Sequence, residues 1–262
     1  MNSQRVYDEM LNLVKLGAAP MELLRVAAHL RSQELESYLK TISKNRILDG
    51  VFKDVISPGQ AYGSVLCPKL MGTYEIEIAT ELMTLLEDAG CFLDIGCAEG
   101  YYTTGVAVKS EVGQIIGVDI NPAALAAAAK SASLNGVGHK CVFFSNLDQA
   151  IDNMTSNPLI MIDVEGDELL VMSRLFQKIQ KRQFQKVILV IETDYLPNRE
   201  TNTDLIVTAL EKNQFQIDKI VKQDPASRFS NLSKTFTRSF LDQALLAMEG
   251  RPNDQCWIIA TR

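Results

Sequence analysis

From about residue 80 onward, short apolar runs alternate with longer stretches of helical periodicity. The apolar runs are rich in Val, Ile and Phe and occupy 91–95, 114–119, 141–144, 158–163 and 186–191, with further candidates at 215–221 and 256–261. The stretches with helical character are 100–109, 122–134, 147–153, 167–180, 202–212 and 239–248, and the polar stretch 223–238 is predicted to be a loop. Short buried strands that alternate with helices are typical of parallel sheets covered on both faces. The pattern predicts an α/β fold with a seven-stranded, mostly parallel sheet.

The first 45 residues carry a helical pattern without strands. Apolar residues recur from Leu11 to Leu16 and from Met21 to Leu30, Pro20 suits the first turn of a helix, and a third helix is expected at 34–42. We therefore expect an N-terminal helical extension, 1–55, and a main domain, 56–262. Amphipathic stripes are usually packing faces. The extension is expected to be a cap or a homodimer surface, with a lid or substrate-selecting element as the alternative.

Composition limits the partners. Hydrophobic residues make up 47% of the 262 residues, and the net charge is −6. An acidic chain without a basic run is a poor candidate for non-specific nucleic-acid binding, so no nucleic-acid partner is expected. No apolar run approaches the ~18 residues of a membrane span, and the N-terminus lacks an apolar signal segment. The five cysteines are scattered and mostly apolar in context, which fits reduced thiols in a cytoplasmic protein.

The most informative segment is CFLDIGCAEGYYTTG, residues 91–105, where an apolar strand ends in a glycine turn and leads into a helix. Such a turn brings backbone N–H groups close to a ligand, and Gly96 and Gly100 carry no side chain that would block the approach. The turn also holds two carboxylates, Asp94 and Glu99, which would repel a pyrophosphate. It therefore favours a ligand with an ammonium or a sulfonium, such as S-adenosylmethionine, over NAD.

Polar residues also follow the next two apolar runs. Asp119 comes 25 residues after Asp94, a distance typical of an acid that hydrogen-bonds ribose hydroxyls. The side-chain oxygen of Asn146 could meet an adenine amine. The structural alternative is helix capping, because Asp119 or Asn121 could cap the helix expected at 122–134.

Acids end the fourth and fifth runs as well. Asp163 and Glu165 lie in IMIDVEGDE, and Glu192 and Asp194 lie in LVIETDY. The first two could instead stabilise the start of the helix expected near residue 167. Acids at four strand ends on one edge of a sheet would repel one another. A cationic ligand, a metal or protonated partners would relieve that repulsion.

The segments DIGCAEG and GVDINP, with the strand–helix alternation, resemble class I S-adenosylmethionine-dependent methyltransferases, which have a Rossmann-like sheet. More narrowly, KLMGTYEIEI (69–78), FLDIGCAEGYYT and IDVEGDE (162–168) resemble the FkbM-type family, and so does the tail EGRPNDQCWIIA (249–260). The resemblance spans about residues 60–260. The chain departs from many superfamily members at Ala98, where they carry glycine.

The resemblance implies a cofactor site around the first strands. The residues expected there are Tyr74, Glu75, Asp94, Gly96, Cys97, Ala98, Gly100, Asp119, Ile120, Asn146 and Asp163. Asp94 and the glycines would hold the methionine part, Asp119 the ribose and Asn146 the adenine. Tyr74 and Glu75 could close over the cofactor.

An alcohol acceptor needs alignment and loss of its proton. The chain has only two histidines, His29 and His139, and both are expected to be structural or exposed. The base candidates are therefore carboxylates: Asp163, Glu165, Glu192 and Asp194, of which the first three are predicted to be catalytic. No metal site is predicted, although two or three of these acids binding Mg²⁺ is an alternative.

Four other residues lie near the expected rim of the sheet: Tyr62, Lys69, Tyr101 and Tyr195. They could contact an acceptor, and ordinary loop packing is the preferred interpretation for Tyr62 and Tyr101.

The leading functional hypothesis is O-methylation of a small hydroxylated metabolite or a sugar with S-adenosylmethionine as methyl donor. One alternative is methylation of a macromolecule, with the N-terminal helices as the recognition element. Another is a non-catalytic S-adenosylmethionine-binding or scaffold protein, which the lack of a histidine base favours. A nicotinamide-dependent dehydrogenase is disfavoured because the chain lacks a G-x-G-x-x-G run.

Overall fold

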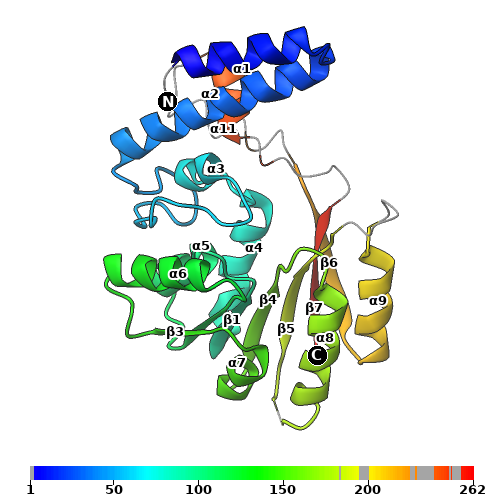
Figure 1. Ribbon diagram of the computed structural model, residues 1–262. Coiled ribbons are helices and arrows are strands. Elements are labelled where there is room, and N and C mark those ends of the chain that lie inside the picture. Colours follow the sequence, from blue (N-terminus) through cyan, green and yellow to red (C-terminus); the bar gives the residue numbers. More distant parts are fainter. Residues whose placement is uncertain are drawn as a thin grey trace.

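The fold is a single seven-stranded sheet with helices on both faces, shown by a computed structural model (Figure 1). The structure describes residues 3–182, 184–194, 201–224, 228, 239–247, 249 and 255–262. The strands are β1 (Cys91–Ile95), β2 (Ile115–Val118), β3 (Cys141–Phe144), β4 (Pro158–Ile162), β5 (Ile188–Glu192), β6 (Gln216–Lys222) and β7 (Cys256–Thr261). All seven predicted strands are therefore confirmed. The predicted loop at 223–238 lies almost entirely outside the described residues.

The strand order is β3-β2-β1-β4-β5-β7-β6. Strands β1 to β5 pair in parallel, and β7 runs antiparallel between β5 and β6. The chain winds outward from β1 to β3 and then crosses back to place β4 on the other side of β1. In open sheets of this kind, ligands bind beyond the carboxyl ends of the strands where the winding direction changes. The topology therefore places a site at the ends of β1 and β4.

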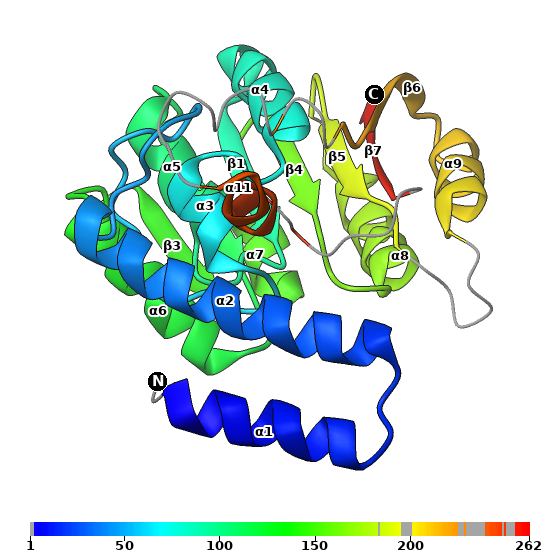
Figure 2. The same cartoon turned by 90° about the horizontal axis from the view of Figure 1, so that it is seen from above.

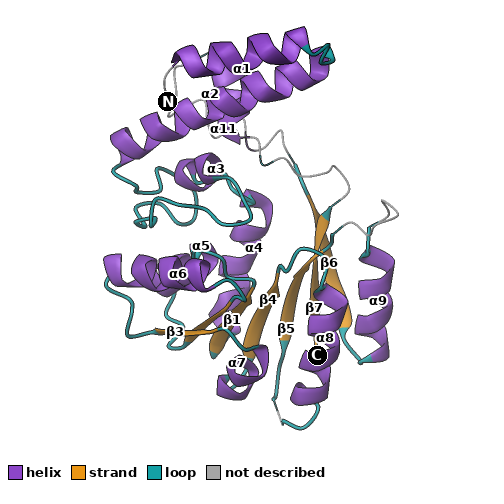
Figure 3. Cartoon of the chain, viewed as in Figure 1, coloured by secondary structure: helices purple, strands orange, loops and turns teal. Residues whose placement is uncertain are grey.

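The described part of the chain contains ten α-helices and a short 3-10 helix, Leu86–Asp88 (Figure 3). The α-helices are α1 (Ser3–Lys15), α2 (Pro20–Ser43), α3 (Leu66–Met71), α4 (Ile76–Leu85), α5 (Tyr101–Lys109), α6 (Pro122–Leu134), α7 (Leu147–Asn153), α8 (Glu168–Ile179), α9 (Thr203–Lys212) and α11 (Phe240–Ala247). None of these described helices is long and apolar enough to cross a membrane.

The two faces of the sheet have separate cores because side chains alternate along each strand. On β1, Phe92 packs on one face against α4 and α5, whereas Leu93 and Ile95 pack on the other against α7 and α8. Strand β4 alternates in the same way. Both faces are buried, which explains the continuous apolar runs in the sequence.

The N-terminal residues form a helical hairpin above the carboxyl edge of the sheet (Figures 1 and 2). The prediction of a separate third helix at 34–42 is wrong, because α2 continues without a break from Pro20 to Ser43. The stretch between the two apolar groups contains no proline or glycine that would end a helix. Leu35 and Leu39 of α2 pack against α3 and α11, and Arg31 forms two hydrogen bonds with the Asp242 carboxylate.

The ends of β1 and β4 approach each other closely at Gly96. Gly96 has φ +91°, and a Cβ added there would lie 1.7 Å from the carbonyl oxygen of Asp163. The amides of Gly96 and Cys97 both donate to the carbonyl of Val118, at the end of β2. A residue without a side chain is thus required where three strand ends meet.

Replacing Gly96 with alanine should destabilise the fold because the new methyl group would displace the β4 end. Gly136→Ala is a matched control, since Gly136 also has a positive φ, +72°, but open space around it. We expect the free energy of unfolding to fall by roughly 1 kcal/mol in the control. In Gly96→Ala it should fall by about 3 kcal/mol or more, because overpacking adds to the backbone strain. Equal free energies of urea unfolding for the two variants would show that the close contact is not a constraint.

Candidate active site

A cavity of about 500 Å³ lies at the carboxyl edge of β1, β2 and β4, where the topology places a ligand. Ten of the residues predicted for the site line it: Tyr74, Asp94, Gly96, Cys97, Ala98, Asp119, Ile120, Asn146, Asp163 and Glu165. Three predicted residues do not: Glu75 and Glu192 lie beside Asp163, and Gly100 begins α5 with φ +80°. Most of the residues predicted for the site therefore line this cavity, although they make up fewer than half of its lining.

Asp94 lies at the inner end of the cavity and is 4% exposed. Its Oδ2 accepts hydrogen bonds from the amide (3.0 Å) and the hydroxyl (2.5 Å) of Thr103, at the start of α5. Burial, with the charges of Asp163 and Asp119, raises the pKa of Asp94 to about 7, although the Thr103 bonds oppose the shift. A bound cation would favour the ionised form and lower this pKa. The charge of the Asp94 carboxyl group at neutral pH therefore depends on the charges around it.

Asp119 organises the glycine loop. Its Oδ2 accepts from the amide of Ala98 (2.9 Å), and its Oδ1 accepts from the amide of Asn121 (2.7 Å). Asn121, not Asp119, caps α6, since the Asn121 oxygen accepts from Ala123. The capping alternative for Asp119 is thus wrong. Each carboxylate oxygen of Asp119 accepts one hydrogen bond from a backbone amide and can accept another.

Two apolar side chains of the cavity lining are exposed. Ile120 is 92% exposed and Leu170, on α8, is 61% exposed, and both line the cavity. Asn146 also lines it, but its side-chain oxygen accepts from the amide of Gln149 and caps α7. The predicted partner of that oxygen is an adenine amine. In the structure the oxygen already accepts one hydrogen bond, from the first turn of α7. Leu170 and Arg174 of the lining were missed because no local motif marks them.

A buried ion pair joins α3 to the glycine loop. Lys69 and Glu99 are 4% and 2% exposed, and the ammonium contacts Glu99 Oε1. The second oxygen of Glu99 accepts from the amide of Tyr62 at 3.0 Å. The ammonium also lies over the rings of Tyr74 (4.7 Å) and Tyr101 (5.5 Å), a favourable cation–π geometry. Glu99 was expected to attract a cationic ligand, and instead its charge is compensated by Lys69.

Tyr62 and Tyr101 also line the cavity, although packing was the preferred interpretation for them. Burial raises the pKa of Tyr101 well above its usual range. Tyr195 lies outside the described residues.

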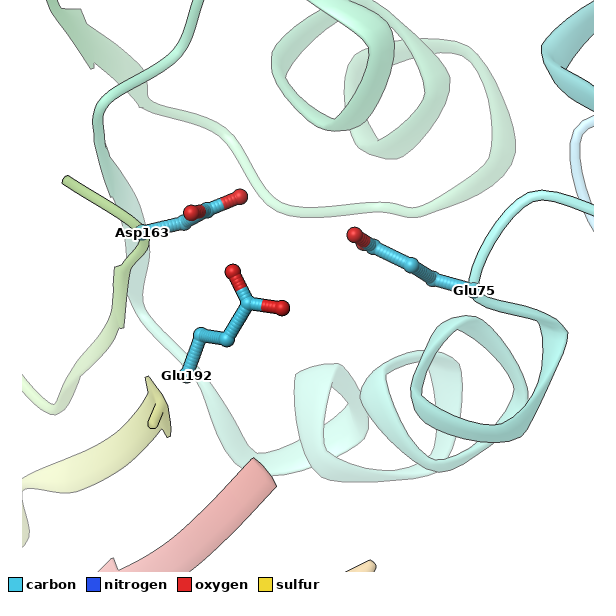
Figure 4. Close-up of side chains that lie close together, drawn as sticks. All are labelled: Glu75, Asp163 and Glu192. Atoms are coloured by element: carbon cyan, nitrogen blue, oxygen red, sulfur yellow. The ribbon is translucent and has the colours of Figure 1, made fainter. Parts of the chain in front are cut away.

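Three carboxylates from distant parts of the chain converge beside the cavity. Glu75, Asp163 and Glu192 each place an oxygen within 4.8 Å of the others. Figure 4 shows the three side chains pointing toward one another, from the start of α4 and from the ends of β4 and β5. Glu75 and Glu192 are buried and Asp163 is half-buried. Carboxylates this close share a proton or hold a cation, because full ionisation of all three would be costly.

Two neighbours hold Glu75 in place. The Tyr102 hydroxyl donates to Glu75 Oε2 at 2.5 Å, and Glu249 Oε1 accepts from the Glu75 amide at 3.0 Å. Burial and the charge of Glu75 raise the pKa of Glu249 to about 8, against the opposing effect of Arg228. Arg228 pairs with Glu249 at 3.0 Å and with Glu77 at 3.2 Å. The position of Glu75 in the cluster with Asp163 and Glu192 is therefore fixed by contacts of both its side chain and its backbone.

The remaining predicted residues take other positions. Glu165 is exposed at the rim of the cavity with φ +54° and is not part of the acid cluster. Asp194 accepts from the Gln255 side chain at 3.1 Å. His29, on α2, is hydrogen-bonded to Gln33, and neither His29 nor His139 lines the cavity. Both histidines thus take the structural or exposed role that was predicted.

Residues 86–234 match the family model of a methyltransferase domain. The match covers more than half of the chain, which therefore belongs to this family of S-adenosylmethionine-dependent methyltransferase domains. Among curated proteins, none matches the chain.

Solved structures share the fold at low identity. A precorrin 8W decarboxylase from Methanobacterium thermoautotrophicum is 16% identical, with TM-score 0.48 over 71% of this chain and 90% of its own. A precorrin-6y C5,15-methyltransferase from Geobacter metallireducens GS-15 is 14% identical, with TM-score 0.48 over 71% and 87%. A geranyl diphosphate C-methyltransferase from Streptomyces coelicolor A3(2) is 12% identical, with TM-score 0.45 over 74% and 81%. Similarity this distant does not indicate the methyl acceptor of this chain.

Lys69→Met should be strongly destabilising because it leaves the Glu99 carboxylate buried without its cation. Breaking one side of a buried pair costs about 3–5 kcal/mol, and the double variant Lys69→Met/Glu99→Gln should recover most of that loss. Lys219→Met is the matched control, since Lys219 pairs with Glu81 on the surface, where such pairs contribute about 1 kcal/mol or less. The free energies of urea unfolding of all four proteins provide the comparison. A Lys69 variant as stable as the Lys219 variant would contradict the account.

Proposed function

We propose that the chain is an FkbM-type O-methyltransferase that transfers the methyl group of S-adenosylmethionine to a hydroxyl of a small metabolite or a sugar. One observation carries this proposal. The two segments that resemble the FkbM-type family, KLMGTYEIEI and IDVEGDE, lie far apart in sequence but meet at the cavity, where Tyr74 and Asp163 line it and Glu75 contacts Asp163. The segments most specific to that resemblance thus build one site.

The cavity fits the chemistry of S-adenosylmethionine. Asp94 is placed to accept hydrogen bonds from an ammonium, and the free acceptor capacity of Asp119 suits ribose hydroxyls. Gly96 leaves the backbone accessible, and Ile120 and Leu170 offer apolar surface to a base. When bound, S-adenosylmethionine supplies a methyl group activated by a sulfonium. The acidic walls favour that positive charge electrostatically.

A carboxylate is the base that the site offers. Asp163 lines the cavity, whereas Glu75 and Glu192 lie next to Asp163 and outside the cavity lining. A proton taken from an acceptor hydroxyl by Asp163 can be shared with these neighbours, which reduces their mutual repulsion. Glu192 is therefore assigned as a supporting acid and Asp163 as the group that touches the acceptor. Exposed Glu165 at the rim is a candidate for binding the acceptor.

The charge of the site also restricts the chemical class of the acceptor. Five carboxylates line the cavity with two cations, Arg174 and Lys69, of which Lys69 is already paired with Glu99. The excess of negative charge disfavours an anionic acceptor such as a phosphorylated sugar or RNA. An uncharged polyol with a free hydroxyl suits this surface better. This reasoning favours a small neutral acceptor over a nucleic acid.

Transfer of a labelled methyl group from S-adenosylmethionine into fractionated extract of the source cell tests the proposal. We expect label in the low-molecular-weight fraction, in a product with a methyl ether. Label in the protein or RNA fraction would replace the proposal with macromolecule methylation. A protein that binds the donor but labels no fraction would be a binding protein without turnover.

Asp163→Asn and Glu192→Gln should separate donor binding from catalysis. Loss of a general base typically lowers turnover by about 10²–10⁴-fold, and we expect that range for Asp163→Asn and a smaller loss for Glu192→Gln. Donor affinity, measured by calorimetry, should change by less than threefold in both. Asp152→Asn, an exposed carboxyl on α7 that pairs with Lys178, is the control and should keep full turnover. A fully active Asp163→Asn would exclude the assigned base.

A further inference from the structure

For its length, the N-terminal hairpin exposes more large apolar side chains than the rest of the described molecule. From Tyr7 to Glu34 no side chain is buried, although the segment is almost entirely helical. Six large apolar side chains of this segment are 41–75% exposed: Tyr7, Leu11, Val14, Leu16, Met21 and Leu24. We call these six residues the hairpin face.

The hairpin face is ordered along the helices. Tyr7, Leu11 and Val14 follow one another at spacings of four and three residues, so they share one face of α1. On α2, Met21 and Leu24 precede Ala28 and Leu35 at the same helical spacing. Ala28 and Leu35 pack against α3 and α11. The α2 stripe that docks on the domain therefore continues, uncovered, beyond the point where the domain ends.

The arrangement of the helices leaves this face open. In both Figure 1 and Figure 2, α2 lies between α1 and the rest of the molecule, and the start of α2 extends past α11. Arg31, near the middle of α2, is hydrogen-bonded to Asp242 of α11, which joins the hairpin to the rest of the molecule.

We propose that a second copy of this chain covers the hairpin face, so that the two hairpins form an antiparallel four-helix bundle. The exposed parts of Tyr7 and of the five aliphatic side chains correspond to roughly 400–600 Å² of apolar surface per copy. That lies in the upper part of the range of about 300–600 Å² for the largest patch on a monomer, which is often functional. A standard interface of ~800 Å² per partner contains about 450 Å² of apolar surface, which the hairpin face can supply.

The charges of the hairpin fit self-association. Residues 3–43 contain five basic and five acidic side chains, so two hairpins do not repel each other. On α1 the acids Asp8 and Glu9 lie near the start and Lys15 lies at the end. A two-fold axis that runs two α1 helices antiparallel places each acidic turn near the partner's Lys15. An anionic membrane surface is a poorer occupant, because such helices carry an excess of Lys and Arg.

The same two-fold axis brings like positions together. With Leu11 at the axis, Leu11 meets its own copy, and Tyr7 meets Val14 of the other chain one turn away. This interface lies apart from the cavity, so its success or failure is independent of the proposed methyl transfer. Its link to the site is mechanical, because α2 packs on α3, and α3 carries Lys69.

Sedimentation equilibrium of the whole chain at about 10 μM tests the proposal. We expect a mass of twice 29.1 kDa for the wild type and a monomer for Leu11→Glu/Leu24→Glu. Leu205→Glu, at an exposed leucine on α9, is the control and should stay dimeric. Circular dichroism and thermal unfolding of each variant show whether it is folded.

A second variant, Leu11→Cys, tests the same interface without the glutamate substitutions that are meant to disrupt it. All five native cysteines are buried, so mild oxidation should cross-link this variant alone into a covalent dimer. A monomeric wild type would overturn the proposal, and so would a double-glutamate variant that remains dimeric. A monomeric wild type that sediments with vesicles of anionic phospholipid would assign the face to a membrane surface instead.

Discussion

The close approach of β1 and β4 at Gly96 is the constraint on which the site depends. The absent side chain at Gly96 allows the carbonyl of Asp163 to lie against the β1 turn. Asp94 and Asp119 then line one wall of the cavity, and Asp163 lines the adjacent wall. A larger residue at this position would push apart the two strand ends that carry these groups. The placement of the site at the reversal of strand order follows from the same contact.

Acidic side chains gathered at one edge of the sheet repel one another unless cations or hydrogen-bond donors compensate their charge. Several of the acids here have such partners. Glu99 is neutralised by Lys69, and Glu249 and Glu77 pair with Arg228. Thr103 donates two hydrogen bonds to Asp94. The cluster of Glu75, Asp163 and Glu192 brings three carboxylates within 4.8 Å of one another, so a proton or a cationic ligand would lower their mutual repulsion. This cluster is where chemistry is proposed.

Much of this architecture can be predicted from the sequence because the patterns that indicate it are local. The strands are continuous apolar runs, and glycine and aspartate follow them at typical distances, so the sheet and the cavity residues at the ends of β1, β2 and β4 could be predicted. The Lys69–Glu99 pair could not, because the partners are 30 residues apart and no periodicity links them. The proximity of Glu75 to Asp163 and Glu192 could not be predicted for the same reason. The Asn146 oxygen caps α7, and its contact with an adenine stays a prediction, because capping and ligand binding require the same chemistry from asparagine.

The most direct test of the central claim is calorimetric titration of the whole chain with S-adenosylmethionine and, separately, with NAD. Acids at the glycine turn and an accessible backbone should bind the cationic cofactor and reject the pyrophosphate. The account predicts stoichiometric binding of S-adenosylmethionine that Asp94→Asn weakens, with no measurable binding of NAD. Binding of NAD without binding of S-adenosylmethionine would contradict it.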